Sequence, residues 1–310
     1  MTTYEKLAAI LAAVQTDPGN RGLARDPHDN LFTATRGDFE AACRSLAAHR
    51  EPEVVVVTGF YIPGATPPAY ETDGPLGAAF LARALIPLGA SFLFIVEQEA
   101  RPLFRHASIP NVSEKWASAR IPPAEYDDAR LAQSQEIREW PVSHLLALER
   151  VGPGTDGHCR NMRGLDISSL TEPADRLFRI YPAVRPDVQT IGIGDGGNEI
   201  GMGKIPHDTI VKNIPNGDLI HCRVPTDHLI VAGVSNWGAY ALAAGVYVLR
   251  GVKPPSDLFD PNREREILEV MVREGPLVDG VTGKQTATVD GLTWDEYVKP
   301  LIRIREILGE

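Results

Sequence analysis

The chain of 310 residues carries 31 basic and 41 acidic side chains, which gives a formal net charge of −10. This charge argues against nucleic acid as the main partner. The apolar content of 43% is ordinary for a globular protein, and the length suits one α/β domain spanning residues 1–310, with room for a small lobe at 101–141. No apolar run approaches the length of a bilayer span, and the first residues lack a signal-peptide pattern, so no membrane partner is expected.

The three cysteines lie far apart in the sequence, at Cys43, Cys159 and Cys222. This spacing supports neither a disulfide framework nor a zinc site, and it fits a reducing cytoplasm. We therefore expect a cytoplasmic protein that acts on a small molecule. The sequence leaves its oligomeric state open, a homo-oligomer included.

Short apolar strands alternate with amphipathic helices along the chain. The apolar spacing of Leu7, Ile10, Leu11 and Val14 predicts an N-terminal helix. Strands are predicted at 53–57, 92–96, 188–193 and 229–234, while 144–148 fits either a strand or a helix. Helices are predicted at 76–88 and 239–249, and two more around a Val/Thr/Gly-rich segment in the last sixty residues.

This alternation predicts a three-layer α/β fold with a mostly parallel central sheet and helices on both faces. Ligands of such sheets bind outside the carboxyl ends of the strands. Each unusual polar cluster in the sequence follows a predicted strand, so we expect the clusters to form one shared site. The proline-containing region 101–141 fits either a small lobe or a pair of exposed helices.

The most informative stretch is IGIGDGGNEIGMGK at 191–204, which holds six glycines. Asp195 and Glu199 are four residues apart, so they would share one face of a short helix after the loop. Two carboxylates on one face can hold a hard divalent cation. The structural alternative is that Asp195 caps the helix while Glu199 is solvated.

Other polar groups carry weaker signals. Glu71 and Asp73 stand at the entrance to a predicted helix, where they are either site residues or an N-terminal cap. Lys204 is either a contact for a substrate carboxylate or a surface lysine, and Asn236 is a plausible cap. Arg21, in the segment between Gly19 and Gly22, could bind a carboxylate through its planar guanidinium.

The spacing of Gly192, Gly194 and Gly197 formally matches a dinucleotide-binding fingerprint. Asp195 would lie in the turn that faces the pyrophosphate, and no clear βαβ unit follows. The fingerprint is therefore discounted.

Taken together, the motifs resemble the D-glutamate cyclase family. The resemblance rests on long matches in the family's order across most of the chain: TGF at 58–60, ETDGP at 71–75, ERVG at 149–152, DG at 156–157, GDGGNEIGMGK at 194–204 and AGVSNWGAYAL at 232–242. It implies conversion of D-glutamate to 5-oxo-D-proline and water. The family's tyrosine-containing run after ERVG is replaced here by GHCRN at 157–161.

That reaction would need a base that deprotonates the amine, a Lewis acid that polarises the γ-carboxylate and a group that binds the α-carboxylate. Magnesium or manganese is the expected cofactor, because carboxylates gather without a cysteine or histidine cluster. The expected metal ligands are Glu71, Asp73, Asp195 and Glu199. The expected catalytic residues are Asp195, Glu199 and Lys204, and the expected substrate-binding residues are Arg21, Gly196, Gly197, Asn198 and Asn236.

Two other functions remain open at this point. The chain could be a nucleotide- or amino-acid-binding module without turnover, or a metal-dependent phosphatase or other hydrolase that uses the same acidic residues.

Overall fold

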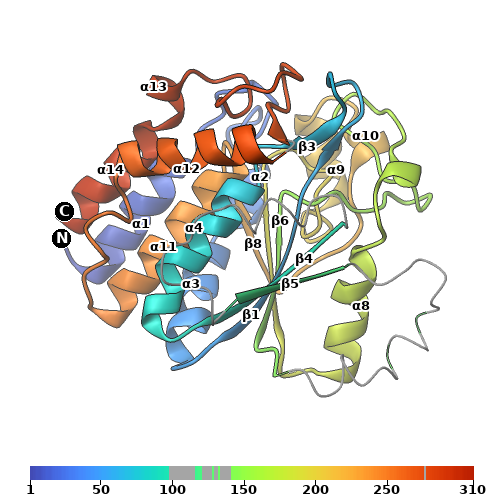
Figure 1. Cartoon of the computed structure of the whole chain (residues 1–310). Helices are drawn as coiled ribbons and strands as arrows, with labels where there is room; N and C mark the ends of the chain where they lie inside the picture. Colours follow the sequence, from blue (N-terminus) through green and yellow to red (C-terminus); the bar gives the residue numbers. More distant parts are fainter. Residues whose placement is uncertain (98–115, 121–127, 129–131, 133–140, 276) are drawn as a thin grey trace.

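The computed structural model describes residues 1–97, 116–120, 128, 132, 141–275 and 277–310. Its centre is a six-stranded sheet in the order β5-β4-β1-β6-β7-β8, in which every neighbouring pair is parallel (Figure 1). The predicted parallel α/β architecture is therefore confirmed. The strands are β1 Glu53–Thr58, β4 Ser91–Val96, β5 Trp116–Arg120, β6 His144–Leu148, β7 Gln189–Gly194 and β8 His228–Val231.

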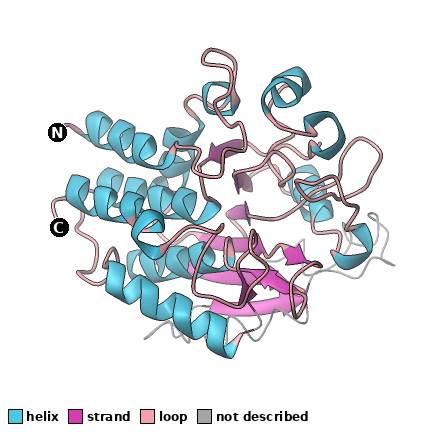
Figure 2. Ribbon diagram, turned by 90° about the horizontal axis from the view of Figure 1, so that it is seen from above, coloured by secondary structure: helices cyan, strands magenta, loops and turns pink. Residues whose placement is uncertain are grey.

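Helices cover both faces of this sheet (Figures 1 and 2). One face packs against α1 Thr3–Val14, α3 Asp38–Ala48, α4 Pro75–Leu85, α11 Ser235–Arg250, α12 Pro261–Glu274, α13 Trp294–Tyr297 and α14 Lys299–Leu308. The other face packs against α2 Leu31–Ala34, α8 Asp175–Val184, α9 His207–Asn213 and α10 Gly217–Ile220. Two short 3-10 helices, η1 Ile86–Leu88 and η3 Ser168–Leu170, complete the described helices.

Strand β1 shows why this sequence forms a sheet covered on both faces. Its four consecutive valines are β-branched and suit a pleated surface. Val54 and Val56 belong to the core on one face, while Val55 and Val57 belong to the core on the other. Successive side chains of a strand point to opposite faces, so an unbroken apolar run is what a two-sided core requires.

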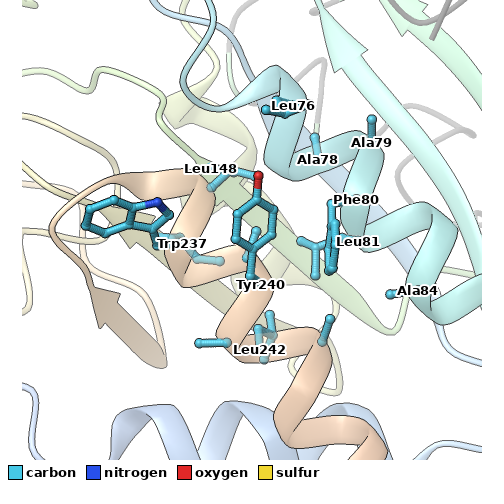
Figure 3. Packing of buried hydrophobic residues seen from close by; sticks show 14 of the residues in the cluster. Leu76, Ala78, Ala79, Phe80, Leu81, Ala84, Leu148, Trp237, Tyr240 and Leu242 are labelled. Atoms are coloured by element: carbon cyan, nitrogen blue, oxygen red, sulfur yellow. The ribbon is translucent and has the colours of Figure 1, made fainter. Parts of the chain in front are cut away.

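Helices α4 and α11 form the centre of the larger core (Figure 3). All eleven residues of α4 are buried, and so are the first thirteen of α11. The ring centroids of Phe80 and Tyr240 lie 4.5 Å apart between the two helices. A Cβ at Gly77 would lie 2.8 Å from Asn236 Oδ1, so glycine is needed for the two N-termini to approach this closely.

A second, three-stranded sheet has the order β2-β3-β9. Its strands are β2 Tyr61–Ile62, β3 Ala69–Glu71 and β9 Leu277–Val278, and β3 pairs with β9 in parallel. This sheet brings the proline-rich segment that follows β1 beside a segment from the end of the chain.

The structure resolves one sequence ambiguity and extends the sheet by one strand. Residues 144–148 form β6, a central strand. Most of region 101–141 lies outside the described residues, as do the lobe and the exposed helices that the sequence suggests there. From this region, β5 is described as an edge strand of the main sheet. No described helix is long and apolar enough to cross a membrane.

The strand order places a topological switch point between β1 and β6. From β1 the chain continues to β4 and β5 on one side, and then returns to β6, β7 and β8 on the other. Ligands of open parallel sheets bind in the crevice that such a reversal creates at the carboxyl ends of the strands.

Candidate active site

A cavity of about 450 Å³ opens at this crevice. Phe60 follows β1, Glu149 follows β6 and Asp195 follows β7, and all three line it. The small sheet contributes Ile62 and Glu71, and the segment after β9 contributes residues 280–283. The remaining lining residues are Arg21, Pro63, Gly64, Asn161, Met162, Arg163, Leu165, Asn198, Glu199 and Asp290.

Three buried carboxylates meet where Glu149 and Asp195 line the inner end of the cavity, and the third, Asp73, is not itself among the lining residues. One oxygen from each of Asp73, Glu149 and Asp195 lies within 4.8 Å of the other two, which is close enough to share one metal ion. The three residues follow β3, β6 and β7, so the sheet topology brings them together from distant parts of the sequence. Glu149 was not among the metal ligands expected from the sequence, although it belongs to the ERVG motif.

Asp73 is held at the N-terminus of α11. Its Oδ2 accepts a hydrogen bond from Ser235 N at 2.9 Å, and its Oδ1 accepts one from Asn236 N at 2.8 Å. These bonds and the helix dipole favour the carboxylate form. Burial outweighs them and, with the nearby Asp290, raises the pKa of Asp73 from 3.8 to about 7.

Asn236, at the start of α11, in turn caps the neighbouring helix α4. Its Oδ1 accepts hydrogen bonds from Gly74 N at 2.9 Å and Gly77 N at 2.7 Å, at the start of α4. Each helix is thus capped by a side chain from the N-terminus of the other. The sequence suggested caps at these positions, but it could not show that they cross between helices.

Glu149 adopts a left-handed backbone conformation, with φ of 46°. Only a few per cent of residues other than glycine do so. Its Oε2 accepts a hydrogen bond from Ser235 Oγ at 2.5 Å. Burial, followed by the negative charges of Glu199 and Asp73, raises the pKa of Glu149 well above its usual range.

The glycine-rich loop folds back on itself. Glu199 Oε1 accepts a hydrogen bond from Asp195 N at 2.8 Å, and its Oε2 accepts one from Gly197 N at 2.7 Å. The expectation of a short helix carrying Asp195 and Glu199 is wrong, because this carboxylate closes the loop and α9 begins only at His207. The amide of Gly197 is therefore already engaged, and no hydrogen bond is described for Gly196 N.

Arg21 binds carboxylates of the protein itself. Its guanidinium lies 3.2 Å from Asp195 Oδ2 and 2.9 Å from Asp290 Oδ2, and it donates to Gly233 O at 3.2 Å. Asp17 holds the turn that carries Arg21 by accepting hydrogen bonds from the three backbone amides of residues 21–23. The arginine thus joins the N-terminal segment to the acidic end of the cavity.

Asp290 is a site residue that the sequence analysis missed. Its backbone is left-handed, with φ of 55°, and its side chain is 6% exposed. An aspartate before Gly291 reads in sequence as an ordinary turn. Only the folded chain places it beside Arg21 and the cavity.

Glu71 lines the cavity with a buried carboxylate. Burial, and then the charges of Glu149, Asp290 and Asp73, raises the pKa of Glu71 well above its usual range. A Cβ on Gly280 would overlap the Glu71 carboxylate, so this glycine makes room for it.

Two further predicted residues differ in position. Asn198 is buried, lines the cavity and donates from Nδ2 to Arg160 O at 2.8 Å. Lys204 is not among the lining residues. Its ammonium lies 2.6 Å from Asp38 Oδ2 and donates to Asp227 O at 2.5 Å.

The charge balance of the site favours a bound cation. Among the described residues, Arg21 is the only cation that forms an ion pair with any of the acids around the cavity. The buried oxygens Asp195 Oδ2 and Asp290 Oδ2 have no hydrogen-bond partner in the described part of the chain, and both share Arg21 as their counter-ion. Carboxylates this close must either bind protons or face a positive ion, and the oxygen donors of Asp73, Glu149 and Asp195 suit a hard divalent metal.

Comparisons with known proteins point to one family. A family model described as "D-glutamate cyclase-like, C-terminal" matches residues 10–305. The chain is also 31% identical over 336 aligned positions to the human protein named "D-glutamate cyclase, mitochondrial". That alignment covers 98% of this chain and 52% of the human protein, so the chain spans about half the length of this relative.

Proposed function

This chain belongs to the D-glutamate cyclase-like family, and on that premise we propose that it is a lyase that cyclises D-glutamate to 5-oxo-D-proline and water. The observation that carries the proposal is the buried group of Asp73, Glu149 and Asp195 at the inner end of an acidic cavity. The activity named for the human relative belongs to a protein about twice as long. For this chain it is a proposal that the site chemistry supports.

The proposed cofactor is Mg²⁺ or Mn²⁺, held by Asp73, Glu149 and Asp195. When bound, the ion would supply a Lewis acid that polarises the γ-carboxylate, which otherwise resists a nucleophile because it is already negative. Asp73 suits the role of a metal ligand, because its Oδ2 accepts only one described hydrogen bond and keeps a lone pair available.

Glu71 is the proposed proton acceptor. Its carboxylate lines the cavity, and its raised pKa makes it a stronger base than an ordinary glutamate. Glu71 would take one proton from the substrate α-ammonium, which leaves a neutral amine. The nitrogen then bonds to the γ-carboxyl carbon, and one carboxyl oxygen leaves as water with this proton and a second one from the nitrogen.

Arg21 and Glu199 have positioning roles in this proposal. Arg21 holds Asp195 and Asp290 in place, and Glu199 fixes the loop that carries Asp195. Lys204 is left out of the chemistry, because its ammonium is engaged by Asp38 and Asp227. The proposed location is the cytoplasm, with the three free cysteines as its support.

The test is incubation of the purified protein with D-glutamate, with L-glutamate as the stereochemical control. Each substrate is supplied with Mn²⁺, with Mg²⁺, or after exhaustive chelation. Loss of primary amine and formation of 5-oxoproline should depend on the metal. No product under any metal condition would refute the cyclase proposal, and full activity after chelation would refute the metal.

A metal-dependent hydrolase remains the second candidate, because the same buried carboxylates could activate water. A panel of phosphate esters tests it under the same metal conditions. A pyrophosphate-binding role for the glycine loop is disfavoured, because Gly192 and Gly194 lie within β7 and Gly197 N is bonded to Glu199.

A further inference from the structure

The rim of the cavity carries a second arginine, which no step above has used. Arg163 lines the cavity, is exposed, and follows the GHCRN segment. Its guanidinium forms no ion pair or hydrogen bond with the described residues. Of the two cationic side chains in the described lining, Arg21 is engaged by protein carboxylates, so Arg163 is the one available to an anion.

The turn that carries Arg163 has a defined position. Asn161 Oδ1 accepts hydrogen bonds from Arg163 N and Leu165 N, both at 3.0 Å. An isolated β-bridge between Arg160 and Asp166 closes the base of this turn. The arginine therefore projects from a held hairpin rather than from an unsupported loop.

The turn is also anchored to its neighbours. Met162 O accepts a hydrogen bond from Asn216 Nδ2 at 3.2 Å. The Met162 sulfur would lie only 2.7 Å from a Cβ built on Gly196, so this side chain packs directly on the glycine loop. The segment that carries Arg163 thus lies against the loop that carries Asp195.

We propose that Arg163 binds the substrate carboxylate that does not react, and so restricts this site to amino acids with two carboxylates. The inference rests on the proposed function. In the cyclisation, the amine and the γ-carboxylate must lie among the acids and the metal at the inner end of the cavity. The α-carboxylate stays unchanged, would be repelled by those acids, and finds its counter-ion at the rim. A planar guanidinium can bind it through two parallel hydrogen bonds.

The experiment compares D-glutamate with 4-aminobutanoate, which is the same molecule without the α-carboxylate. Calorimetry measures the binding of both ligands to the wild type and to Arg163→Gln. Steady-state kinetics with Mn²⁺ follow. The matched control is Arg265→Gln, which removes the same charge from the exposed face of α12.

We expect Arg163→Gln to weaken D-glutamate binding by about 10- to 100-fold and to raise its KM by a similar factor, with kcat nearly unchanged. Binding of 4-aminobutanoate should change by less than about threefold. Arg163→Lys should recover part of the loss, because it restores the charge without the fork. The Arg265→Gln control should resemble the wild type.

Three results would overturn the inference: equal losses for both ligands in Arg163→Gln, no loss for either, or no measurable D-glutamate binding by the wild type. The proposed function fails separately. If the wild type binds D-glutamate through Arg163 but forms no 5-oxoproline, carboxylate recognition stands and the cyclase activity does not.

Discussion

At the residue scale, the site is a group of acids whose charges exceed the cations paired with them. Burial raises the pKa of Asp195 well above its usual range, and the nearby Arg21 only partly offsets this effect. Such a group is costly for stability unless protons or a metal ion balance it, and strongly perturbed carboxylates in a cleft are a common mark of function.

Asp195→Asn separates a chemical role from a structural one. The amide has nearly the same shape, and Arg21 keeps its ion pair with Asp290, so the melting temperature should stay close to that of the wild type. Turnover should fall by about 10²- to 10⁴-fold, because the variant loses a charge that would hold the proposed cation. Melting curves and product formation are measured on one preparation. If the variant turns over as fast as the wild type, Asp195 has only a structural role.

Asp73 gives a prediction about pH. Its pKa is near 7 when folded and 3.8 in an ordinary environment, so the folded protein holds a proton there that the unfolded chain releases. This group therefore lowers the free energy of unfolding as pH rises from about 4 to about 7. In metal-free protein, the melting temperature of Asp73→Asn minus that of the wild type should increase across this window and then level off.

The difference between variant and wild type matters here because His144 and His221 act in the opposite direction. Burial lowers the pKa of His144 to about 3 and that of His221 to about 4. Both groups therefore lower the free energy of unfolding as pH falls below the ordinary pKa of histidine. These terms cancel in the comparison. A difference that stays flat or decreases between pH 4 and 7 would contradict the assignment to Asp73.

The sequence predicted part of this candidate site and missed the rest for a physical reason. Asp73 and Asp195 stand in unusual local patterns, a Gly-Pro helix entrance and a glycine-rich loop, so they could be singled out. Glu149 and Asp290 enter the site through left-handed backbone positions and long-range packing. Such features depend on contacts between distant segments, which local patterns do not record.

At the element scale, the crossed caps of α4 and α11 join the site to the core. Asp73 serves α11 and Asn236 serves α4, so two buried helix N-termini are satisfied by each other's side chains. The helices themselves could be predicted from apolar spacing. Their pairing could not, because it depends on which helices the sheet places side by side.

Asn236→Ala should destabilise the protein by about 1–2 kcal/mol, because Gly77 N loses its acceptor in a buried place and Gly74 N keeps only its bond to Asp73 Oδ1. Differential scanning calorimetry measures the change. Thr2→Ala, which removes the exposed cap of α1, is the matched control and should cost less, because water can replace the lost bond. An equal or smaller loss at Asn236 would mean that its cap contributes nothing beyond an ordinary one.

At the scale of the whole molecule, the parallel sheet and its two covered faces could be predicted because periodicity and strand–helix alternation dictate them. The small sheet could not be predicted, since β2 and β9 are two residues each and carry no periodic signal. Strand β5, which lies in the proline-containing region 101–141, was not predicted either. Within the larger core, a buried polar network joins α4, α11 and α12. Arg83 of α4 binds Glu264 of α12 at 2.8 Å, and Glu264 accepts a hydrogen bond from Tyr240 of α11.

Arg83→Met should therefore affect stability and leave the chemistry intact. It would leave Glu264 buried without its cation, which typically costs about 3–5 kcal/mol. At about 2 °C per kcal/mol, the melting temperature should fall by roughly 6–10 °C. The double variant Arg83→Met/Glu264→Gln removes both charges and should recover part of this loss. At 25 °C, metal binding and turnover of the single variant should match the wild type, because neither Arg83 nor Glu264 lines the cavity. A loss of turnover without a change in melting would show that this network acts on the site, and the separation between core and chemistry would be wrong.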